Sequence, residues 1–208
     1  MTGLRERKKQ RNRDAIARAA LRLFDRQGFH QTTIPQIAEA ADVSPRTVSM
    51  HFPAKEELVF PHREEELERL TERVRGRTLD ETAPEALRAW VEAELPGWEE
   101  RHAEHDVQRR VVERDEHLKA YARGHLGRIH DLMAQEIARD LGTPPDAPEP
   151  HMAAAATSAV LEVLEHHTHD RGGDVATRKA EALALLDKAT AFVSAGIREL
   201  QQSATPNG

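Results

Sequence analysis

Residues 33–52, with the sequence TIPQIAEAADVSPRTVSMHF, hold the polar side chains whose types and spacing best predict a chemical role. Ser44 and Pro45 are typical of a helix start, because a Ser hydroxyl can accept a backbone hydrogen bond and Pro lacks an N–H that the first turn leaves unused. Such a start can present its side chains to base edges in the major groove of DNA. The segment therefore predicts a nucleic-acid interface.

A second short helix must hold this one in place. Thr33 and Gln36 predict a capping box at the start of a helix over residues 34–41, and Pro35 suits its first turn. Small or β-branched apolar residues stand where two crossing helices would touch: Ile37, Ala38, Ala41, Val43 and Val48. The pattern predicts a helix-turn-helix, with the second helix over residues 45–51.

Residues 32–44, together with FDRQGF before them (24–29) and HFPAKEEL after them (51–58), resemble the N-terminal domain of the TetR (tetracycline-repressor-like) family of bacterial transcriptional regulators. The resemblance covers about residues 8–60. It implies a ligand-responsive DNA-binding regulator, typically a repressor released from a palindromic operator by a small organic effector. Residues 43–47 and 52–60 are also similar to a subgroup whose C-terminal domains resemble those of regulators that bind acyl-CoA-like ligands.

The resemblance implies DNA contacts along the second helix and beside it. Arg46 is the expected bidentate partner of a guanine, a contact that discriminates between bases. Family members often have Tyr in place of Ser49, and Gly in place of Asp42, which must adopt a left-handed backbone here. The implied contact residues are Thr33, Ser44, Pro45, Arg46, Thr47, Ser49, Met50, His51 and Lys55.

The distribution of charge supports a nucleic-acid partner more than the net charge of −6 does. Residues 1–60 carry eleven Lys or Arg and seven Asp or Glu, whereas the rest carries nineteen and twenty-nine. Beside a helix-turn-helix, a basic segment is expected near phosphates or in the minor groove. The basic side chains of this segment are Arg5, Arg7, Lys8, Lys9, Arg11 and Arg13.

Composition and periodicity predict an all-α fold of two domains, a three-helix DNA-binding domain over residues 1–53 and a larger helical domain over 54–208. Ala, Leu, Glu and Arg dominate, and no alternating strand pattern occurs. Cysteine is absent, which excludes disulfides and thiolate chemistry. We expect a cytoplasmic protein, because the first residues lack a secretory signal and the longest apolar run, 152–161, is too short to span a bilayer.

The periodicity places the remaining helices with two interruptions by proline. A helix over 54–75 should bend at Pro61, and one that follows residue 84 should kink or break at Pro96–Gly97. The other predicted helices cover residues 9–26, 106–114, 115–141, 151–169 and 174–201, with a loop at 142–150.

Small apolar residues form seams along the last two predicted helices, which suits a two-fold homodimer interface. One seam consists of Met152, Ala156, Ala159, Val160, Val163 and Leu164. The other consists of Ala182, Leu185, Leu186, Ala189, Val193, Gly196, Ile197 and Leu200.

The resemblance also implies a small-molecule pocket among the middle helices. Its expected lining residues are Trp98, Tyr121, His125 and Met133. The 54–75 helix is expected to transmit a ligand-induced displacement to the DNA-binding domain.

Two alternatives remain open. A metal-responsive regulator would use the twelve histidines, of which His166, His167 and His169 are the densest group and His102 and His105 lie one turn apart. A helical enzyme or interaction module could retain the DNA-binding fold, although no phosphate loop, nucleophile elbow or HExxH pattern occurs. We expect neither an enzyme nor a bound metal or other cofactor.

Overall fold

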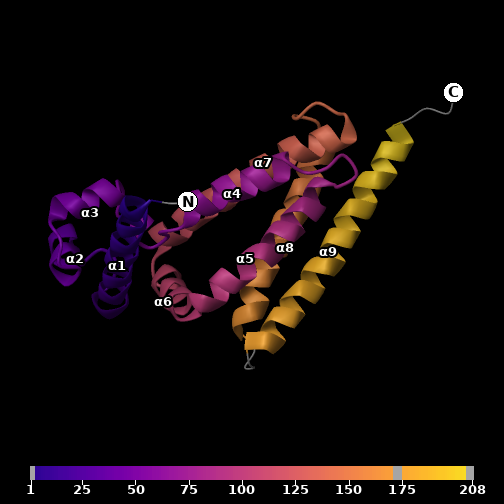
Figure 1. Ribbon diagram of the computed structural model, residues 1–208. Coiled ribbons are helices and arrows are strands. Elements are labelled where there is room, and N and C mark those ends of the chain that lie inside the picture. The colour runs from indigo at the N-terminus through magenta and orange to yellow at the C-terminus, as the bar shows by residue number, and fades with distance from the viewer. Residues whose placement is uncertain (1–2, 171–174, 205–208) are drawn as a thin grey trace. The chain divides into compact units, whose positions relative to one another are not determined.

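A computed structural model describes the backbone of residues 3–170 and 175–204. At residues 4–6, 98–100, 102, 160–170, 175–176, 178–179, 182 and 201–204 it describes the backbone alone. Within these ranges all regular structure is helical, as the sequence predicted (Figure 1). The elements are α1 (Leu4–Gln27), α2 (Ile34–Ala40), α3 (Pro45–His51), η1 (Glu56–Leu58), α4 (Arg63–Arg75), α5 (Ala83–Glu100), α6 (His102–Glu113), α7 (Glu116–Leu141), α8 (Pro148–Asp170) and α9 (Val175–Ala204).

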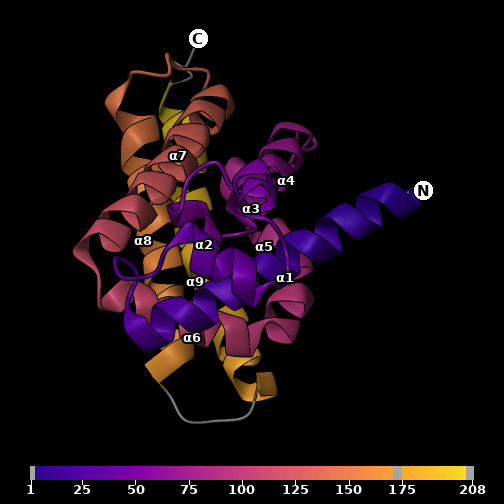
Figure 2. The same ribbon diagram turned by 90° about the vertical axis from the view of Figure 1, so that its left-hand side faces the viewer.

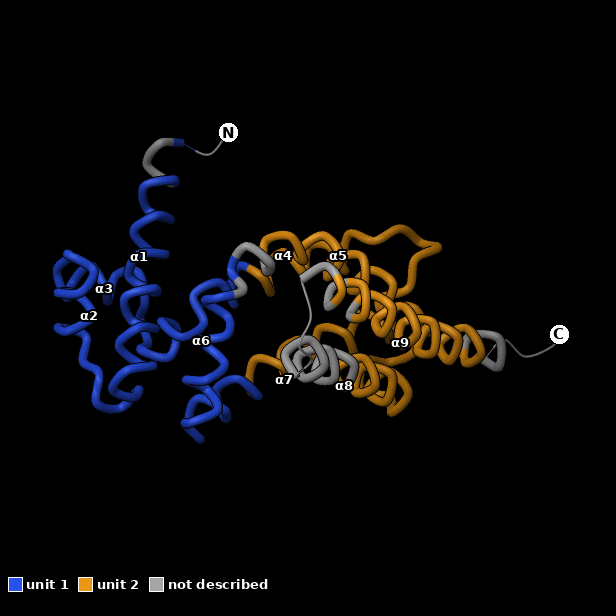
Figure 3. The backbone as a smooth tube through the Cα atoms, turned by 90° about the horizontal axis from the view of Figure 1, so that it is seen from below, with its two compact units in different colours: residues 1–65, 100–123 blue, residues 66–99, 124–208 orange. Residues whose placement is uncertain are grey.

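The chain forms two compact units, residues 1–65 with 100–123 (unit 1) and residues 66–99 with 124–208 (unit 2), coloured in Figure 3. The chain therefore passes from one unit to the other within α4, at the end of α5 and within α7. This division differs from the single domain boundary that was expected at residue 53. The reason is hydrophobic: Leu58, Val59 and Phe60 are buried in the core of unit 1, together with Val111 of α6 and Leu118 of α7.

The bend predicted at Pro61 is wrong, and the break predicted at Pro96 does not occur. Pro61 lies in the turn between η1 and α4, not inside one bent helix. A Pro at this position cannot donate the backbone hydrogen bond that a continuous helix requires. Pro96 lies inside α5, which continues to Glu100 without the expected break. Helix α1 begins at Leu4, five residues before the predicted start, and α8 begins at Pro148, inside the predicted loop.

Unit 1 is built around α1, against which α2 and α6 pack. Ile16, Ala20 and Phe24 point from α1 into a core shared with Ile37 and Val48. The first turns of α1 project beyond the rest of the unit (Figure 2). The basic N-terminal segment, expected to precede the first helix, is therefore the start of that helix.

Unit 2 has a separate apolar core formed by α4, α5, α7, α8 and α9. The loop between α4 and α5 is fixed to α7 by Arg77. Its guanidinium donates to the Glu136 carboxylate (2.8 Å), to the Glu136 carbonyl (3.0 Å) and to Asp140. Because Glu136 is 0% exposed, its charge requires such partners. Over the described residues, no helix combines the length and apolar character needed to cross a membrane.

Candidate nucleic-acid interface

Local hydrogen bonds set the starts of α2 and α3 as the sequence predicted. Gln36 N–H donates to Thr33 Oγ1 (3.4 Å), while Thr33 N–H donates to Gln36 Oε1 (2.9 Å), which completes the capping box. Thr47 N–H donates to Ser44 Oγ at 3.0 Å, with Pro45 in the first turn of α3. These bonds define where each helix begins and which residues its first turn exposes.

The turn between the two helices contains the left-handed residue expected there. Asp42 has φ = 53°, a region that non-glycine residues seldom adopt but that Asp tolerates. Val43 N–H donates to the Ala38 carbonyl at 2.9 Å, which closes the turn behind α2.

One face of α3 is buried and the other is exposed. Val48 is 0% exposed and packs in the core of unit 1. On the opposite side Arg46 and Ser49 are exposed, and Met50 is 72% exposed although it is apolar. Helix α3 therefore presents a cation, a hydroxyl and a thioether on one face. This set can donate hydrogen bonds to base edges and contact a thymine methyl.

The nine expected contact residues fall into three groups in the structure. Six are exposed and one, Thr47, is half-buried with its hydroxyl 2.8 Å from Ser44 Oγ. The exposed six are Thr33, Ser44, Pro45, Arg46, Ser49 and Met50. The remaining two, His51 and Lys55, are engaged within the unit.

His51 is 7% exposed at the end of α3, so its ring does not lie on the exposed face. Its carbonyl accepts a hydrogen bond from Arg13, whose guanidinium also donates to the Pro61 carbonyl (2.9 Å) and lies 4.3 Å from the centre of the Phe52 ring. Arg13 was expected among the cations available to DNA. It instead ties α1 to the end of α3 and to the turn before α4.

Lys55 is half-buried against the loop after α1. Its Nζ donates to the Phe29 carbonyl at 2.6 Å and lies 4.3 Å from the centre of the Phe29 ring. Burial lowers the pKa of Lys55 below its ordinary value, against the opposing charges of Glu56 and Asp115. One of its three N–H groups is therefore used within the fold. Only the other two could take part in the phosphate binding that was expected of Lys55.

Helix α6 and the start of α7 belong to this unit, which the sequence analysis missed. Arg110 and Arg114 donate to Asp25 of α1 at 3.0 and 3.2 Å. These bonds lower the pKa of Asp25, with the hydrogen bond from Arg110 as the largest cause. His117 and Glu56 are joined at 2.6 Å. The spacing of the apolar residues Val107, Val111 and Leu118 predicts a buried helix face, but it does not show which helix packs against that face.

Of the four expected effector-site residues, the structure describes three side chains, in two different units. Tyr121 is in unit 1, where its ring stacks on Phe60 with centroids 5.7 Å apart. Met133 is 0% exposed in the core of unit 2, and His125 is half-buried in the same unit. The side chain of Trp98 lies outside the described residues.

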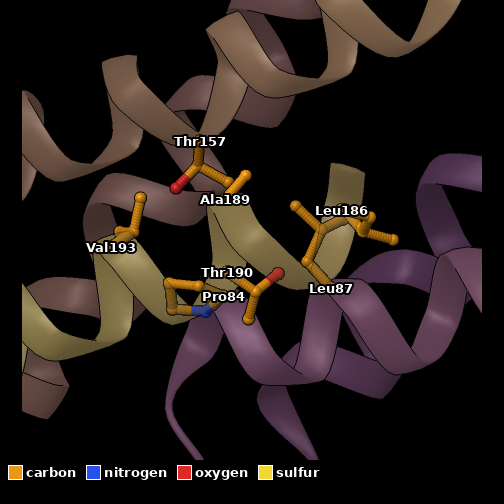
Figure 4. Close-up of a pocket in the computed structure, with 7 residues that line it drawn as sticks. All are labelled: Pro84, Leu87, Thr157, Leu186, Ala189, Thr190 and Val193. Atoms are coloured by element: carbon orange, nitrogen blue, oxygen red, sulfur yellow. The ribbon is translucent and has the colours of Figure 1, made fainter. Parts of the chain in front are cut away.

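A different small cavity lies in unit 2, among α5, α8 and α9. Its volume is about 10 Å³. Figure 4 shows the lining residues, which are Pro84, Leu87, Thr157, Leu186, Ala189, Thr190 and Val193. As it stands the cavity has room for about one water molecule, and a larger ligand would require the helices to separate.

The metal candidates are only partly described. The side chains of His102, His166, His167 and His169 lie outside the described residues. Among the residues that are described, no group of three or more His, Cys, Asp or Glu side chains could hold a metal ion.

Comparison with known proteins agrees with this geometry. Residues 16–60 match the family model for bacterial regulatory proteins of the tetR family. Over 58 residues the chain is 53% identical to the HTH-type transcriptional regulator TcmR of Streptomyces glaucescens, which covers 28% of this chain and 26% of TcmR. The chain thus matches about a quarter of the length of that curated relative.

Two solved structures are similar over most of the chain. The SmeT–triclosan complex has a TM-score of 0.57 at 20% identity, covering 89% of this chain and 90% of SmeT. Native NalD of Pseudomonas aeruginosa has a TM-score of 0.56 at 24% identity, covering 87% of this chain and 96% of NalD. At these identities the likeness shows the fold.

The fold and the exposed face of α3 define a helix-turn-helix protein. Residues 16–60 form an N-terminal domain of the kind found in bacterial regulatory proteins of the tetR family.

The burial of His51 predicts a pH dependence of unit 1. Burial lowers the pKa of His51 below its ordinary value of 6.5, and the positive charges of Arg13 and Lys9 lower it further. The unfolded chain therefore binds more protons than the folded chain as the pH falls through 6.5. The stability that depends on neutral His51 is complete above pH 6.5 and decreases toward the lower folded-state pKa.

Native-state hydrogen exchange of amides in α1–α3 measures this stability between pH 7.5 and 5, after correction for intrinsic exchange rates. Wild type should lose more opening free energy over this range than His51→Gln, because Gln does not titrate. Parallel curves for the two proteins would show that His51 does not carry the effect.

Proposed function

We propose that this protein is a DNA-binding transcriptional regulator that reads an operator with the exposed face of α3. The observation that carries the proposal is the division of α3 into a buried side, anchored by Val48, and an exposed side that presents Arg46, Ser49 and Met50. The match of residues 16–60 to the tetR family model supports it. We revise the contact set by leaving out His51 and giving Lys55 a structural role.

The N-terminal turns of α1 add a basic surface to this interface. Arg7, Lys8 and Arg11 are exposed on the part of α1 that projects from unit 1 (Figure 2). Contacts from such cations to phosphates add affinity with little dependence on sequence, whereas base contacts from α3 add selectivity. A single unit reads a half-site, so a palindromic operator requires two copies, about 34–36 Å or somewhat more apart.

Two copies would associate through the exposed face of α8 and α9. Phe192 is 76% exposed and Met152 is 71% exposed, which is unusual for large apolar side chains. Gly196 is one turn after Phe192, and nothing lies within 4 Å of an added Cβ there. The predicted seam is revised, because Leu186, Val193 and Ile197 are buried in the core of the same chain.

We also propose that a small, partly apolar organic molecule regulates operator binding through unit 2. SmeT has been solved with triclosan and is the repressor of a multidrug efflux pump of Stenotrophomonas maltophilia. NalD is a secondary repressor of another such pump. The cavity of Figure 4, with apolar walls and the hydroxyls of Thr157 and Thr190, is the proposed entry point.

For such a ligand to release DNA, it must bind the non-binding state of the dimer more tightly than the binding state. Helices α4 and α7 each contribute residues to both units, so both can carry a displacement along the chain. This replaces the expected route through one 54–75 helix, which the turn at Pro61 interrupts.

The first test of DNA recognition is Arg46→Ala, measured by fluorescence anisotropy on operator fragments taken from upstream of the gene. Loss of a bidentate guanine contact should reduce discrimination against base changes by about 1–3 kcal/mol at one position of each half-site. Arg22→Ala is the matched control, because Arg22 is an exposed arginine of α1 outside the proposed contact set. Equal selectivity of wild type and Arg46→Ala would exclude Arg46 as the base-reading residue.

The dimer surface is tested by Phe192→Arg and Gly196→Arg, with Gln135→Arg on an exposed site of α7 as the control. Either α9 variant should sediment as a monomer and lose at least tenfold in operator affinity, since each half-site is then bound alone. Both positions are exposed, so the substitutions leave the core of the unit in place. A dimer that persists in both variants would mean that another surface joins the copies.

The effector is tested by adding candidate apolar compounds, triclosan among them, to the protein–operator complex while anisotropy is followed. Thr190→Val should leave operator affinity unchanged and weaken the response, because a neutral hydrogen bond contributes about 0.5–1.5 kcal/mol. Calorimetry on the free protein shows whether a compound binds. If every compound that binds in the screen leaves operator affinity unchanged, the protein binds DNA constitutively.

A further inference from the structure

Two histidines that are far apart in the sequence meet in unit 2. Nε2 of His130, on α7, lies 3.4 Å from Nδ1 of His151, at the start of α8, in the geometry of a hydrogen bond. The ring planes are inclined by 25°, and the ring centres are 5.6 Å apart. The two rings therefore approach each other most closely through these two nitrogen atoms. His130 is half-buried and His151 is exposed, so solvent reaches the pair.

This distance between the two nitrogens matches the distance between two ligand atoms bound to one metal ion. Zinc–imidazole bonds are about 2.0–2.1 Å long, so two nitrogens on one tetrahedral ion lie about 3.3–3.4 Å apart. The helices already hold the two nitrogens at that distance. Binding requires rotation of the rings and a tautomer in which both facing nitrogens lack hydrogen, but it requires no movement of α7 or α8.

We propose that His130 and His151 form a two-histidine site for a late first-row divalent ion. Imidazole nitrogen suits copper, nickel and zinc, and the usual order of affinity places Cu²⁺ above Ni²⁺ and Zn²⁺. No third protein ligand joins the pair within the described part of the chain, so water completes the coordination. Mg²⁺ and Ca²⁺ prefer oxygen ligands and are excluded.

An ion at this site links two helices of the same unit. His130 lies near the middle of α7, and His151 lies in the first turn of α8, with the 142–147 connection between the helices. Because the unfolded chain does not hold the nitrogens together, the ion binds the folded unit preferentially and stabilises it. The site does not depend on the proposed DNA-binding function, although it would give a metal ion access to the unit that we propose to be the sensor.

The test uses the full chain with His166, His167 and His169 replaced by Gln, which removes the other dense group of histidines. Calorimetric titration with NiCl₂ and CuCl₂ should show one site, which Mg²⁺ does not occupy. His130→Ala and His151→Ala should each weaken it at least tenfold, and the double variant should lose less affinity than the sum of the two single losses, because either single change already destroys the chelate.

Three further readouts complete the test. Thermal unfolding of the parent should shift upward with Ni²⁺, whereas the single variants should show no shift. His30→Ala, which removes an exposed histidine of unit 1, should leave both measurements unchanged. The Cu²⁺ spectrum of the parent should show two equatorial nitrogens and that of His151→Ala fewer. The proposal would be overturned if the double variant lost as much affinity as the two single variants together, or if it bound as many ions as the parent.

Discussion

The burial of Val48 in the core of unit 1, with α3 packed on α2, is the interaction on which the proposed interface depends. Helix α3 has seven residues, too few to be stable alone, so tertiary contacts determine how it is rotated. With Val48 buried among Ile16, Phe24 and Ile37, the helical period places Arg46, Ser49 and Met50 toward solvent. The same rotation buries His51, three residues after Val48. One apolar contact thus decides both which side chains can reach a base and which cannot.

Local chemistry explains what the sequence could predict. The two caps, the left-handed Asp42 and the bounds of α3 depend on residues at most five positions apart, and each was predicted correctly. Helix α2 ends at Ala40, one residue before its predicted end. The proline predictions were wrong because proline gives only the local cost of continuing a helix. Pro61 follows Leu58, Val59 and Phe60, all of which are buried, and a turn there lets the chain close the core of unit 1. Pro96 is exposed near the end of α5, where one missing hydrogen bond faces water.

Long-range contacts explain what the sequence could not show. Arg13 and the His51 carbonyl are 38 positions apart, and Lys55 and the Phe29 carbonyl are 26 positions apart. Both cations were assigned to DNA because a sequence shows a charge without its partner. The same holds for His130 and His151, which are 21 positions apart in the sequence. The sequence pattern therefore did not pair them and pointed to the denser group of histidines at residues 166–169. In each case the residue type was recognised and its role depended on a tertiary neighbour.

Helix α9 combines two tasks that the sequence pattern merged into one seam. Val193 and Ile197 face the core of unit 2, while Phe192 and Gly196, each one residue earlier, face away from it. Thr190 and Ala189, on the inner side, line the cavity beside α5 and α8. A ligand that separates these helices must therefore move the backbone that also carries Phe192. If Phe192 forms the dimer contact, the ligand changes the geometry of that contact without touching it. Under these two proposals, sensing and association share one helix, so a response requires no separate relay between them.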